Sequence, residues 1–356
     1  MCIRDSSITF AQVYDIARNT GAYLVEQLGV DRTPVAVFAG RKMVTPAYFL
    51  GVVYAGRPYA PIDASLPDKR IEKILENLCP GAIVADRESL EHVESIVDEL
   101  AKAEGFDRPQ IFIAEDISRF EQVACADSNC KISESAGDAV TDSENDTDGG
   151  VVAGCAGKTD DSSRDMLAVV RRQMSMTDPL YIIYTSGSTG NPKGVMTSHL
   201  SLMTYINAYC DVMHIEESDV LGNQSPLDYI AAIRDIYLPL KTGCSTAIIP
   251  KEYFMEPNAL FDYMNDKKVS SVGWSVSAFT ILTSLGAFEE VGLKSLRKIC
   301  FSGSVMPCRV LRKWQENLPE AHFVNQYGPT EATASCTYYS VDPVSYTHLR
   351  AHETVL

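Results

Sequence analysis

Residues 181–195 read YIIYTSGSTGNPKGV: four apolar or aromatic residues, then a segment with three glycines, four hydroxyl side chains and one lysine. The uncharged run from Tyr181 to Tyr184 predicts a short buried strand. Glycines let backbone N–H groups approach an anion closely, while the hydroxyl groups and Lys193 add donors and a positive charge. The segment therefore predicts a polyphosphate-binding loop directly after a strand.

This loop differs from the Walker A phosphate loop. Pro192 precedes the lysine and Gly194 follows it, where the Walker A motif has Gly and then Ser or Thr. A glycine-rich turn without a ligand is the simpler alternative, but such a turn needs neither the hydroxyl groups nor the lysine.

Short apolar runs alternate with helical patterns on both sides of the loop. Strands are predicted over residues 35–38, 82–85, 110–114, 181–184, 246–249, 271–275, 299–302 and 323–326. Helices are predicted from Thr9, between Pro67 and Pro80, and over 88–103. Such alternation is typical of parallel sheets covered by helices, so the predicted fold class is α/β.

The composition excludes several classes of function. Acidic residues outnumber basic ones, 47 to 31, in 356 residues, which argues against nucleic-acid binding and against an anionic membrane surface. The longest uncharged apolar run covers 13 residues, 44–56, and a spanning helix needs about 18 or more. Ten cysteines without a CxxC pair favour free thiols in the cytoplasm.

The stretch 124–165 breaks the alternation. It holds ten acidic and three basic residues, much Gly, Ser and Thr, and no aromatic residue. Such a segment cannot bury enough apolar surface to offset its ordering entropy, so a disordered insertion is predicted. A calcium loop over 142–148 is the alternative, although the spacing does not follow the EF-hand pattern.

The two ends of the chain do not fit the elements beside them. Residues 1–6 (MCIRDS) and 344–356 (VSYTHLRAHETVL) look like translated sequencing adaptor. We therefore expect the natural part of this sequence to run from about residue 7 to residue 343 and to be cut at both ends.

Three segments together resemble one known family. Along the chain come AGRPYAPID (55–63) with LPDKRI (66–71), then YTSGSTGNPKGV (184–195), then NQYGPTE (325–331). These segments are similar, in this order, to motifs of the adenylate-forming, or AMP-binding, superfamily. This superfamily includes acyl-CoA synthetases, luciferases and amino-acid adenylation domains. The final motif and the PID segment most resemble nonribosomal peptide synthetase adenylation domains and D-alanine–carrier-protein ligases.

The resemblance implies an architecture. Residues 7–343 would form the large N-terminal domain, with parallel sheets flanked by helices in two similar subdomains. The family's TGD aspartate, hinge and small C-terminal domain have no counterpart in the sequence, so this chain is expected to be inactive alone.

The resemblance also implies ATP and Mg²⁺ as cofactors, with Glu331 as the metal ligand. The implied catalytic residues are Lys193, Thr330 and Glu331. The implied nucleotide-binding residues are Thr185, Ser186, Gly187, Ser188, Thr189, Gly190, Lys193, Asn325, Tyr327, Gly328 and Thr330. Among these, Tyr327 would stack on adenine, Asn325 would bind its exocyclic amine, and Thr330 would contact the α-phosphate.

The implied amino-acid pocket leaves one alternative open. Matching Leu227-Asp228 to the family's F-D-x-S segment gives Asp228 the role of binding the substrate amine, whereas alignment from Asp235 places Ile230 there. The other implied lining residues are Trp274, Ser275, Cys300, Ser302, Gly303, Gln326 and Ala334. The sequence 302–304 (SGS) replaces the family's usual Gly-Gly-Glu, so the identity of the amino acid stays open.

The function implied by the resemblance is activation of an amino acid. Its carboxylate and MgATP would give an aminoacyl-adenylate and pyrophosphate. The aminoacyl group would then pass to the phosphopantetheine thiol of a carrier protein. The alternatives are an acyl-CoA synthetase-like acid–thiol ligase and, for this chain alone, a nucleotide-binding module without turnover.

Overall fold

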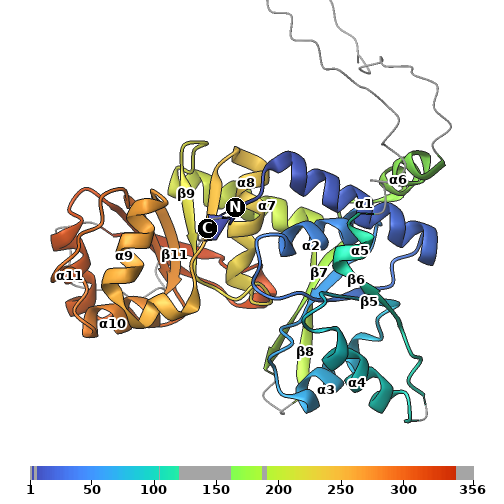
Figure 1. Ribbon diagram of the computed structural model, residues 1–356. Coiled ribbons are helices and arrows are strands. Elements are labelled where there is room, and N and C mark those ends of the chain that lie inside the picture. Colours follow the sequence, from blue (N-terminus) through green and yellow to red (C-terminus); the bar gives the residue numbers. More distant parts are fainter. Residues whose placement is uncertain (1, 4–5, 104, 120–161, 187–190, 342–356) are drawn as a thin grey trace, which may run out of the picture.

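Two β-sheets form the centre of the protein, and helices cover both faces of each sheet (Figure 1). The computed structural model describes residues 2–3, 6–103, 105–119, 162–186 and 191–341. Within these ranges the interior strands of both sheets run parallel, and the antiparallel pairs lie at sheet edges. The predicted α/β fold class is confirmed.

The smaller sheet has six strands in the order β6-β5-β3-β4-β7-β8. Its strands are β3 (Val35–Phe38), β4 (Tyr59–Pro61), β5 (Ala82–Ala85), β6 (Gln110–Ile113), β7 (Pro179–Ser186) and β8 (Pro192–Ser198). All neighbours are parallel except β7 and β8, which form an antiparallel hairpin.

Alternating side chains of the smaller sheet enter two separate cores. Val37 and Tyr181 face the core shared with α1, α2, α5 and α6, whereas Phe38 and Ile182 face the core formed with α3 and α4. The spacing of its apolar residues explains the buried face of α3. These helices are α1 (Phe10–Leu28), α2 (Thr45–Tyr54), α3 (Asp68–Leu78), α4 (Leu90–Leu100), α5 (Ala114–Ile117) and α6 (Ser162–Gln173).

The larger sheet has eight strands in the order β14-β13-β12-β11-β9-β10-β1-β2. Its strands are β1 (Cys2–Ile3), β2 (Ser6–Ser7), β9 (Val220–Asn223), β10 (Ser245–Ile248), β11 (Ser271–Ser275), β12 (Lys298–Ser302), β13 (His322–Tyr327) and β14 (Thr337–Ser340). The six strands from β13 to β1 are parallel to one another.

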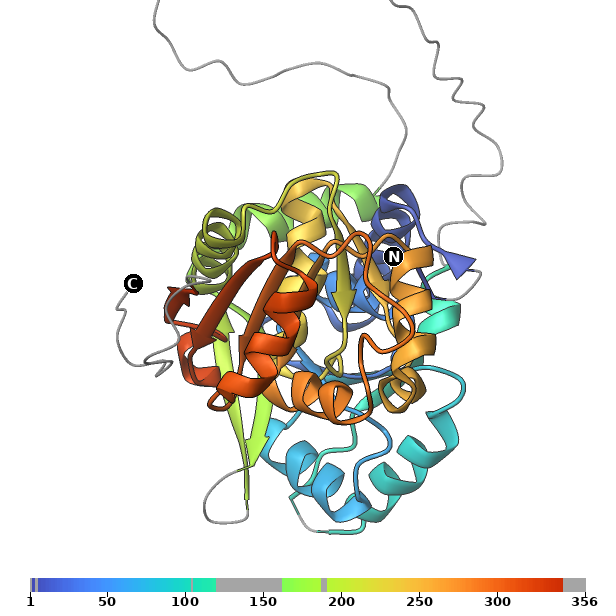
Figure 2. The same ribbon diagram turned by 90° about the vertical axis from the view of Figure 1, so that its left-hand side faces the viewer.

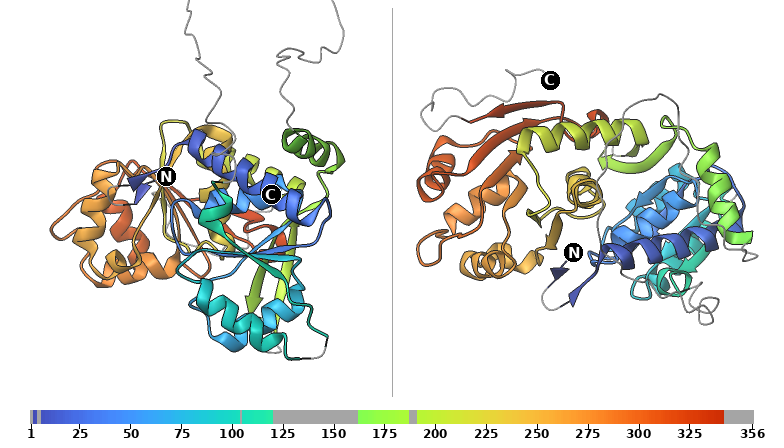
Figure 3. Two further views of the ribbon diagram at one scale, coloured as in Figure 1. Left: turned by 45° about the vertical axis from the view of Figure 1, so that its right-hand side comes forward. Right: turned by 90° about the horizontal axis from the view of Figure 1, so that it is seen from above.

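Helices α7 and α8 lie between the two sheets, and both contribute to the core that the sheets share. Figure 3 shows the yellow helix α8 end-on between the blue and the orange-red halves. Helices α9, α10 and α11 cover the outer face of the larger sheet (Figure 1). The remaining elements are α7 (His199–Met213), α8 (Ile233–Thr242), α9 (Pro257–Asp266), α10 (Val276–Ser284), α11 (Cys308–Asn317) and the 3₁₀ turns η2 (Ile230–Ala232), η3 (Lys251–Met255) and η4 (Thr330–Ala332).

All eight predicted strands are present, with bounds that differ by three residues or fewer. The three predicted helices are α1, α3 and α4. The analysis missed β8, which begins with Pro192, Lys193 and Gly194, because that composition is typical of a loop. It also missed the short strands β4, β9 and β14.

The motif over residues 55–71 has a structural role in this fold. It carries the chain from the end of α2 through β4 into α3. Gly56 has φ of +77°, and a Cβ there would lie 2.6 Å from Val170 Cγ1. Arg57 is 2% exposed, forms an ion pair with Asp31 and donates to the backbone carbonyls of Leu28, Gly29 and Thr33. This part of the motif therefore stabilises a buried turn.

Several predictions concern residues at the margins of the described ranges. Residues 124–161 of the predicted insertion, the calcium-loop alternative over 142–148 and residues 344–356 lie outside the described residues. Residues 162–165, which were placed in the insertion, form the first turn of α6. Cys2 of β1 pairs with Ala247 of β10, and the adaptor origin of residues 1–6 stays a prediction. In the described part of the chain, no helix is both long and apolar enough to cross a membrane.

Candidate functional site

The carboxyl ends of β11, β12 and β13 gather most of the predicted site residues. Ser275 ends β11 and pairs with Ser302, which ends β12, and Phe301 of β12 pairs with Asn325 of β13. Tyr327 ends β13. Ligands of parallel α/β sheets commonly bind beyond the carboxyl ends of the strands, so this edge is the candidate site.

The predicted phosphate loop joins the two strands of the β7–β8 hairpin. Thr185 pairs with Lys193 across the hairpin, and Ser186 pairs with Pro192. The side chain of Lys193 is exposed, whereas Gly187, Ser188, Thr189 and Gly190 lie outside the described residues. Figure 2 shows the light-green hairpin running down beside the blue helix α3.

The base of the hairpin is tightly packed. A Cβ on Gly194 would lie 2.9 Å from Ile182 Cγ2 and 3.1 Å from the ring of Tyr184, so this position requires glycine. The hydroxyl of Tyr184 donates to Asn77 Oδ1 at 2.8 Å, and burial raises the pKa of Tyr184 to about 12. These contacts fix the strands from which the loop extends.

The hairpin strand and the second motif lie together. Residues of β8 and η4 approach within 8 Å, Cα to Cα. The strand that carries Lys193 is therefore beside the turn formed by Thr330 and Glu331. Glu331 is exposed and Thr330 is half-buried.

The turn after β13 is held by close backbone packing. A Cβ on Gly328 would lie 2.5 Å from Ser335 Cα, so only glycine fits. The N–H of Cys336 donates to the carbonyl of Tyr327 at 2.9 Å. Thr333 and Ala334 have backbone φ angles of +53° and +71°, which residues other than glycine rarely adopt. Such strain is often found at functional sites.

Strand alternation sorts the predicted residues onto two faces of the larger sheet. Cys300 lies in the core shared with α7 and α8, and the half-buried Ala334 packs against that core. Ser302 and Gln326 point to the same face by alternation. Asn325 and Tyr327 alternate with Gln326 and so point to the opposite face. The structure thus separates Asn325 and Tyr327 from Cys300, Ser302 and Gln326.

Trp274 does not lie with the other predicted lining residues. Its side chain is 1% exposed in the core formed with α9, α10 and α11, and its indole N–H donates to the carbonyl of Gly222 at 2.8 Å. Ser275, the next residue, points to the face of Ser302 and accepts a hydrogen bond from the N–H of Ala278. Gly303, with φ of +93°, follows β12 and is exposed.

Asp228 lies in a different cavity, of about 250 Å³, between the two subdomains. Its carboxylate shares that cavity with Asp63, Arg41 and Lys251. Burial and the negative charge of Asp63 raise the pKa of Asp228 above its ordinary value. The lining of this cavity includes none of the residues predicted at β11, β12 or β13. Ile230, the alternative, is buried in the core shared by the sheets.

The sequence analysis missed Arg234 as a candidate. Arg234 is 4% exposed in the first turn of α8, and a Cβ on Gly273 of β11 would lie 2.3 Å from its Nε. Gly273 pairs with the predicted lining residue Cys300. The available signal was an arginine beside an aspartate in an otherwise apolar run, 230–237.

The donor set fits Mg²⁺ bound jointly with a nucleotide. Within the described ranges no group of three or more His, Cys, Asp or Glu side chains could hold a metal ion. Glu331 is a single exposed carboxylate. Mg²⁺ sites in nucleotide-binding proteins commonly combine one or two carboxylates with substrate phosphates.

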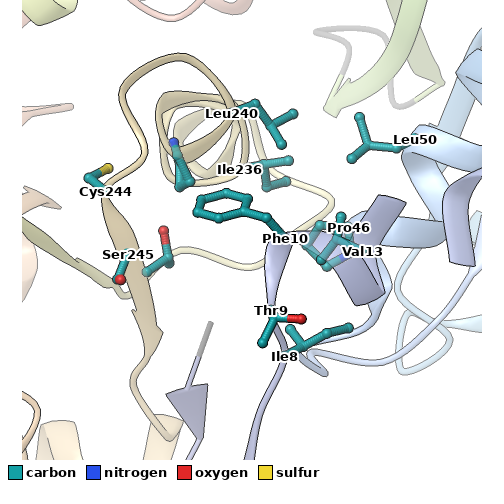
Figure 4. Close-up of a pocket in the computed structure, with 12 residues that line it drawn as sticks. Ile8, Thr9, Phe10, Val13, Pro46, Leu50, Ile236, Leu240, Cys244 and Ser245 are labelled. Carbon is teal, nitrogen blue, oxygen red and sulfur yellow. The ribbon is translucent and has the colours of Figure 1, made fainter. Parts of the chain in front are cut away.

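A further cavity of about 250 Å³ is mostly apolar. It lies between α1, α2, α8 and β10, and Figure 4 shows Phe10 pointing toward Ile236 and Leu240. Its lining includes none of the predicted site residues.

A protein-family model described as AMP-binding enzyme matches residues 2–353. The chain belongs to this family. The resemblance drawn from the three motifs is therefore confirmed, and the family is one of enzymes.

Similar curated proteins are ligases. The D-alanine–D-alanyl carrier protein ligases of Bacillus cereus strains AH187 and ATCC 10987 are 28% and 29% identical to this chain over 335 residues. Each match covers 94% of this chain and 56% of the relative, so the chain spans little more than half the length of these relatives.

Solved structures confirm the fold of the family's large domain. The Vibrio cholerae adenylation domain AlmE, in complex with glycyl-adenosine-5'-phosphate, has a TM-score of 0.71 at 20% identity, covering 99% of this chain and 60% of that one. The four-domain nonribosomal peptide synthetase holo-AB3403, bound to AMP and glycine, has a TM-score of 0.70 at 19% identity, covering 98% and 21%.

Proposed function

We propose that this AMP-binding chain binds MgATP and an amino acid at the carboxyl ends of β11, β12 and β13. In the whole protein, this site would convert the amino acid to an aminoacyl-adenylate and release pyrophosphate. The observation that carries the proposal is the contact between β8 and η4, because it places the Lys193 strand beside Thr330 and Glu331.

The reaction needs positioning and charge neutralisation more than acid–base catalysis. A carboxylate oxygen of the amino acid attacks the α-phosphorus of ATP. The new P–O bond forms as the bond to the β-phosphate oxygen breaks, and pyrophosphate leaves with that electron pair. Lys193 and the backbone N–H groups of the loop would bind the phosphate oxygens as their charge shifts.

The other residues of the NQYGPTE segment have distinct proposed roles. Tyr327, at 45% exposed, offers a ring face on which adenine can stack, and Asn325 would bind the adenine amine. Thr330 would donate to the α-phosphate, and Glu331 would hold Mg²⁺. When bound, Mg²⁺ would offset the negative charge of the phosphates.

The second step would transfer the aminoacyl group to a carrier protein. The phosphopantetheine thiol of that carrier would attack the aminoacyl carbonyl, forming a thioester and releasing AMP. The names of the Bacillus cereus relatives support a carrier partner. The six cysteines with described side chains are free thiols, which supports the expected cytoplasmic location.

Calorimetry with the 356-residue chain tests the nucleotide site. Lys193→Ala should weaken MgATP binding about 10- to 100-fold, because a charge-assisted hydrogen bond contributes about 1.5–3 kcal/mol. Lys102→Ala, which removes an exposed lysine paired with Glu99 on α4, is the control and should bind like the wild type. Equal affinities of all three proteins would overturn the assignment of Lys193.

Pyrophosphate exchange with the whole protein tests the type of acid. We expect exchange that depends on one amino acid. Exchange driven by fatty or aryl acids instead would favour an acyl-CoA synthetase-like ligase. For the 356-residue chain alone we expect binding without turnover, and sustained adenylate formation by this chain would contradict that expectation.

A further inference from the structure

Arg234 is a buried cation at the base of the candidate amino-acid site. It is 4% exposed and lies between α7 and the larger sheet. Its guanidinium carbon is 5.9 Å from the ring centroid of Tyr209 on α7. On the other side it faces Gly273 of β11, where a Cβ would lie 2.3 Å from Nε and 2.4 Å from Cζ. Gly273 leaves the space that the guanidinium occupies.

The protein surrounds this cation with one carboxylate, that of Asp235, and with the side chains of Tyr205 and Tyr209. The nearest carboxylate oxygen, Asp235 Oδ1, lies 3.4 Å from Nε, and Nε forms no hydrogen bond within the described part of the chain. The other oxygen of Asp235 accepts a hydrogen bond from Asn223 Nδ2 at 2.9 Å. A guanidinium carries five N–H donors, and leaving buried donors unpaired is costly.

A further polar atom on the same side of the sheet also lacks a partner. Oε1 of Gln326 on β13 is buried without a hydrogen-bond partner in the described residues. Gln326 follows the Phe301–Asn325 pair by one residue, so it lies level with Ser302. Unpaired buried polar atoms that gather at one site point to a polar ligand.

The guanidinium lies level with Gly273, two residues before Ser275 along β11. Gly273 pairs with Cys300, and two residues further along the strands Ser275 pairs with Ser302. Because side chains alternate, these four residues share one face of the sheet. A ligand resting on Ser275 and Ser302 would therefore direct its distal end toward Arg234.

We propose that Arg234 selects an amino acid whose side chain ends in a carboxylate. This inference rests on the proposed function. A planar guanidinium can bind a carboxylate through two parallel hydrogen bonds, which a neutral amide cannot match in charge. The pair with Asp235 holds the guanidinium in place, and Asp235 shares its negative charge between Arg234 and Arg41.

Binding of non-hydrolysable sulfamoyladenosine analogues to the 356-residue chain tests this selection. We expect the aspartyl or the glutamyl analogue to bind at least tenfold more tightly than its asparaginyl or glutaminyl counterpart, as measured by calorimetry. Each pair of ligands differs in one terminal group, so the comparison isolates the carboxylate. Equal or tighter binding of the neutral analogues would overturn the proposal without any variant.

Two variants link the selection to Arg234. Arg234→Gln should remove the preference for the acidic analogue while binding of MgATP stays within about twofold. Arg57→Gln is the matched control, because Arg57 is similarly buried but has its partners in the segment from Leu28 to Thr33, and it should keep the preference. A preference that survives Arg234→Gln would overturn the role of Arg234.

The same experiment separates this inference from the proposed function. If neither MgATP nor any analogue binds the wild-type chain, the proposed function fails and the inference fails with it. If MgATP and the analogues bind but acidic and neutral forms are equal, the function stands and the inference about Arg234 is wrong.

Discussion

Each end of the larger sheet buries a cluster of charged side chains. The two clusters differ in how many of their hydrogen-bonding groups have a partner within the protein. At the amino ends of the strands, Asp219 accepts hydrogen bonds from Ser270 Oγ at 2.6 Å, Arg297 Nη2 at 2.7 Å, Lys298 Nζ at 2.6 Å and the N–H of Glu216 at 2.9 Å. Both of its oxygens are used twice. This cluster ties together the starts of β9, β11 and β12.

The cluster at the carboxyl ends is less complete. Asn223, which ends β9, accepts from Arg41 and donates to Asp235, and Asp235 is 3.4 Å from Arg234. Nε of Arg41 and Nε of Arg234 are buried without a hydrogen-bond partner in the described residues. The comparison indicates that the first cluster has a structural role, whereas the second has donors left over for a ligand.

The largest expected effect comes from breaking the complete cluster. Asp219→Ala should lower the free energy of unfolding by about 3–5 kcal/mol, because it leaves the largely buried Lys298 without its counter-charge. Denaturant unfolding measures the loss. Selection among sulfamoyladenosine analogues should stay as in the wild type, and a changed preference would contradict a purely structural role.

The stability lost in Asp219→Ala should also depend on pH. Burial raises the pKa of Asp219, but hydrogen bonds from Lys298, Ser270 and the N–H of Glu216 outweigh it and lower the pKa below 3.8. The carboxylate therefore stabilises the fold above about pH 3.8, and this contribution is lost as the pH falls through the lowered pKa. The difference in the free energy of unfolding between the wild type and Asp219→Ala should become smaller in that acidic range. A difference that does not depend on pH would contradict this account.

The sequence predicted the strands that carry these two clusters better than it predicted the charged residues in them. Strands β11, β12 and β13 are short apolar runs, and local pattern alone locates them within a residue or two. Arg234 was missed because its burial depends on α7, β11 and β12, which are far from it along the chain. Neither the pairing of Gly273 with Cys300 nor the space left by a missing Cβ can be inferred from local pattern.

In the candidate site, too, the sequence predicted residues but not their tertiary contacts. The motifs identified Lys193, Tyr327 and Glu331 as candidates, but the contact between β8 and η4 is a tertiary feature that spacing does not contain. The sequence also could not separate Trp274 from Ser275, because the choice of face depends on which side of the strand the helices α9, α10 and α11 cover.

The next largest effect comes from filling the space beside the incomplete cluster. Gly273→Ala should destabilise the protein by about 1–3 kcal/mol, since the new methyl group must displace the guanidinium of Arg234. It should also reduce the preference for acidic sulfamoyladenosine analogues. Gly292→Ala is the control, because a Cβ there meets nothing within 4 Å. If the preference survives in Gly273→Ala, Arg234 does not set it.

The smallest expected effect concerns Asp228, a carboxylate that faces Asp63 across the cavity between the subdomains. Its pKa is raised by burial and by Asp63, so the folded state holds its proton more tightly than the unfolded state, for which 3.8 is the ordinary value. Stability linked to Asp228 is therefore complete below about pH 3.8 and is lost as the pH rises through the raised pKa.

Asp228→Asn should stabilise the chain by about 0.5 kcal/mol at pH 7 and by nothing measurable near pH 3.5. Asp262→Asn, which changes an exposed carboxylate on α9, is the control and should show no such gain at pH 7. A variant Asp228→Asn that is less stable than the wild type at pH 7 would instead mean that the charged carboxylate has a stabilising partner, as the complete cluster at the other end of the sheet has.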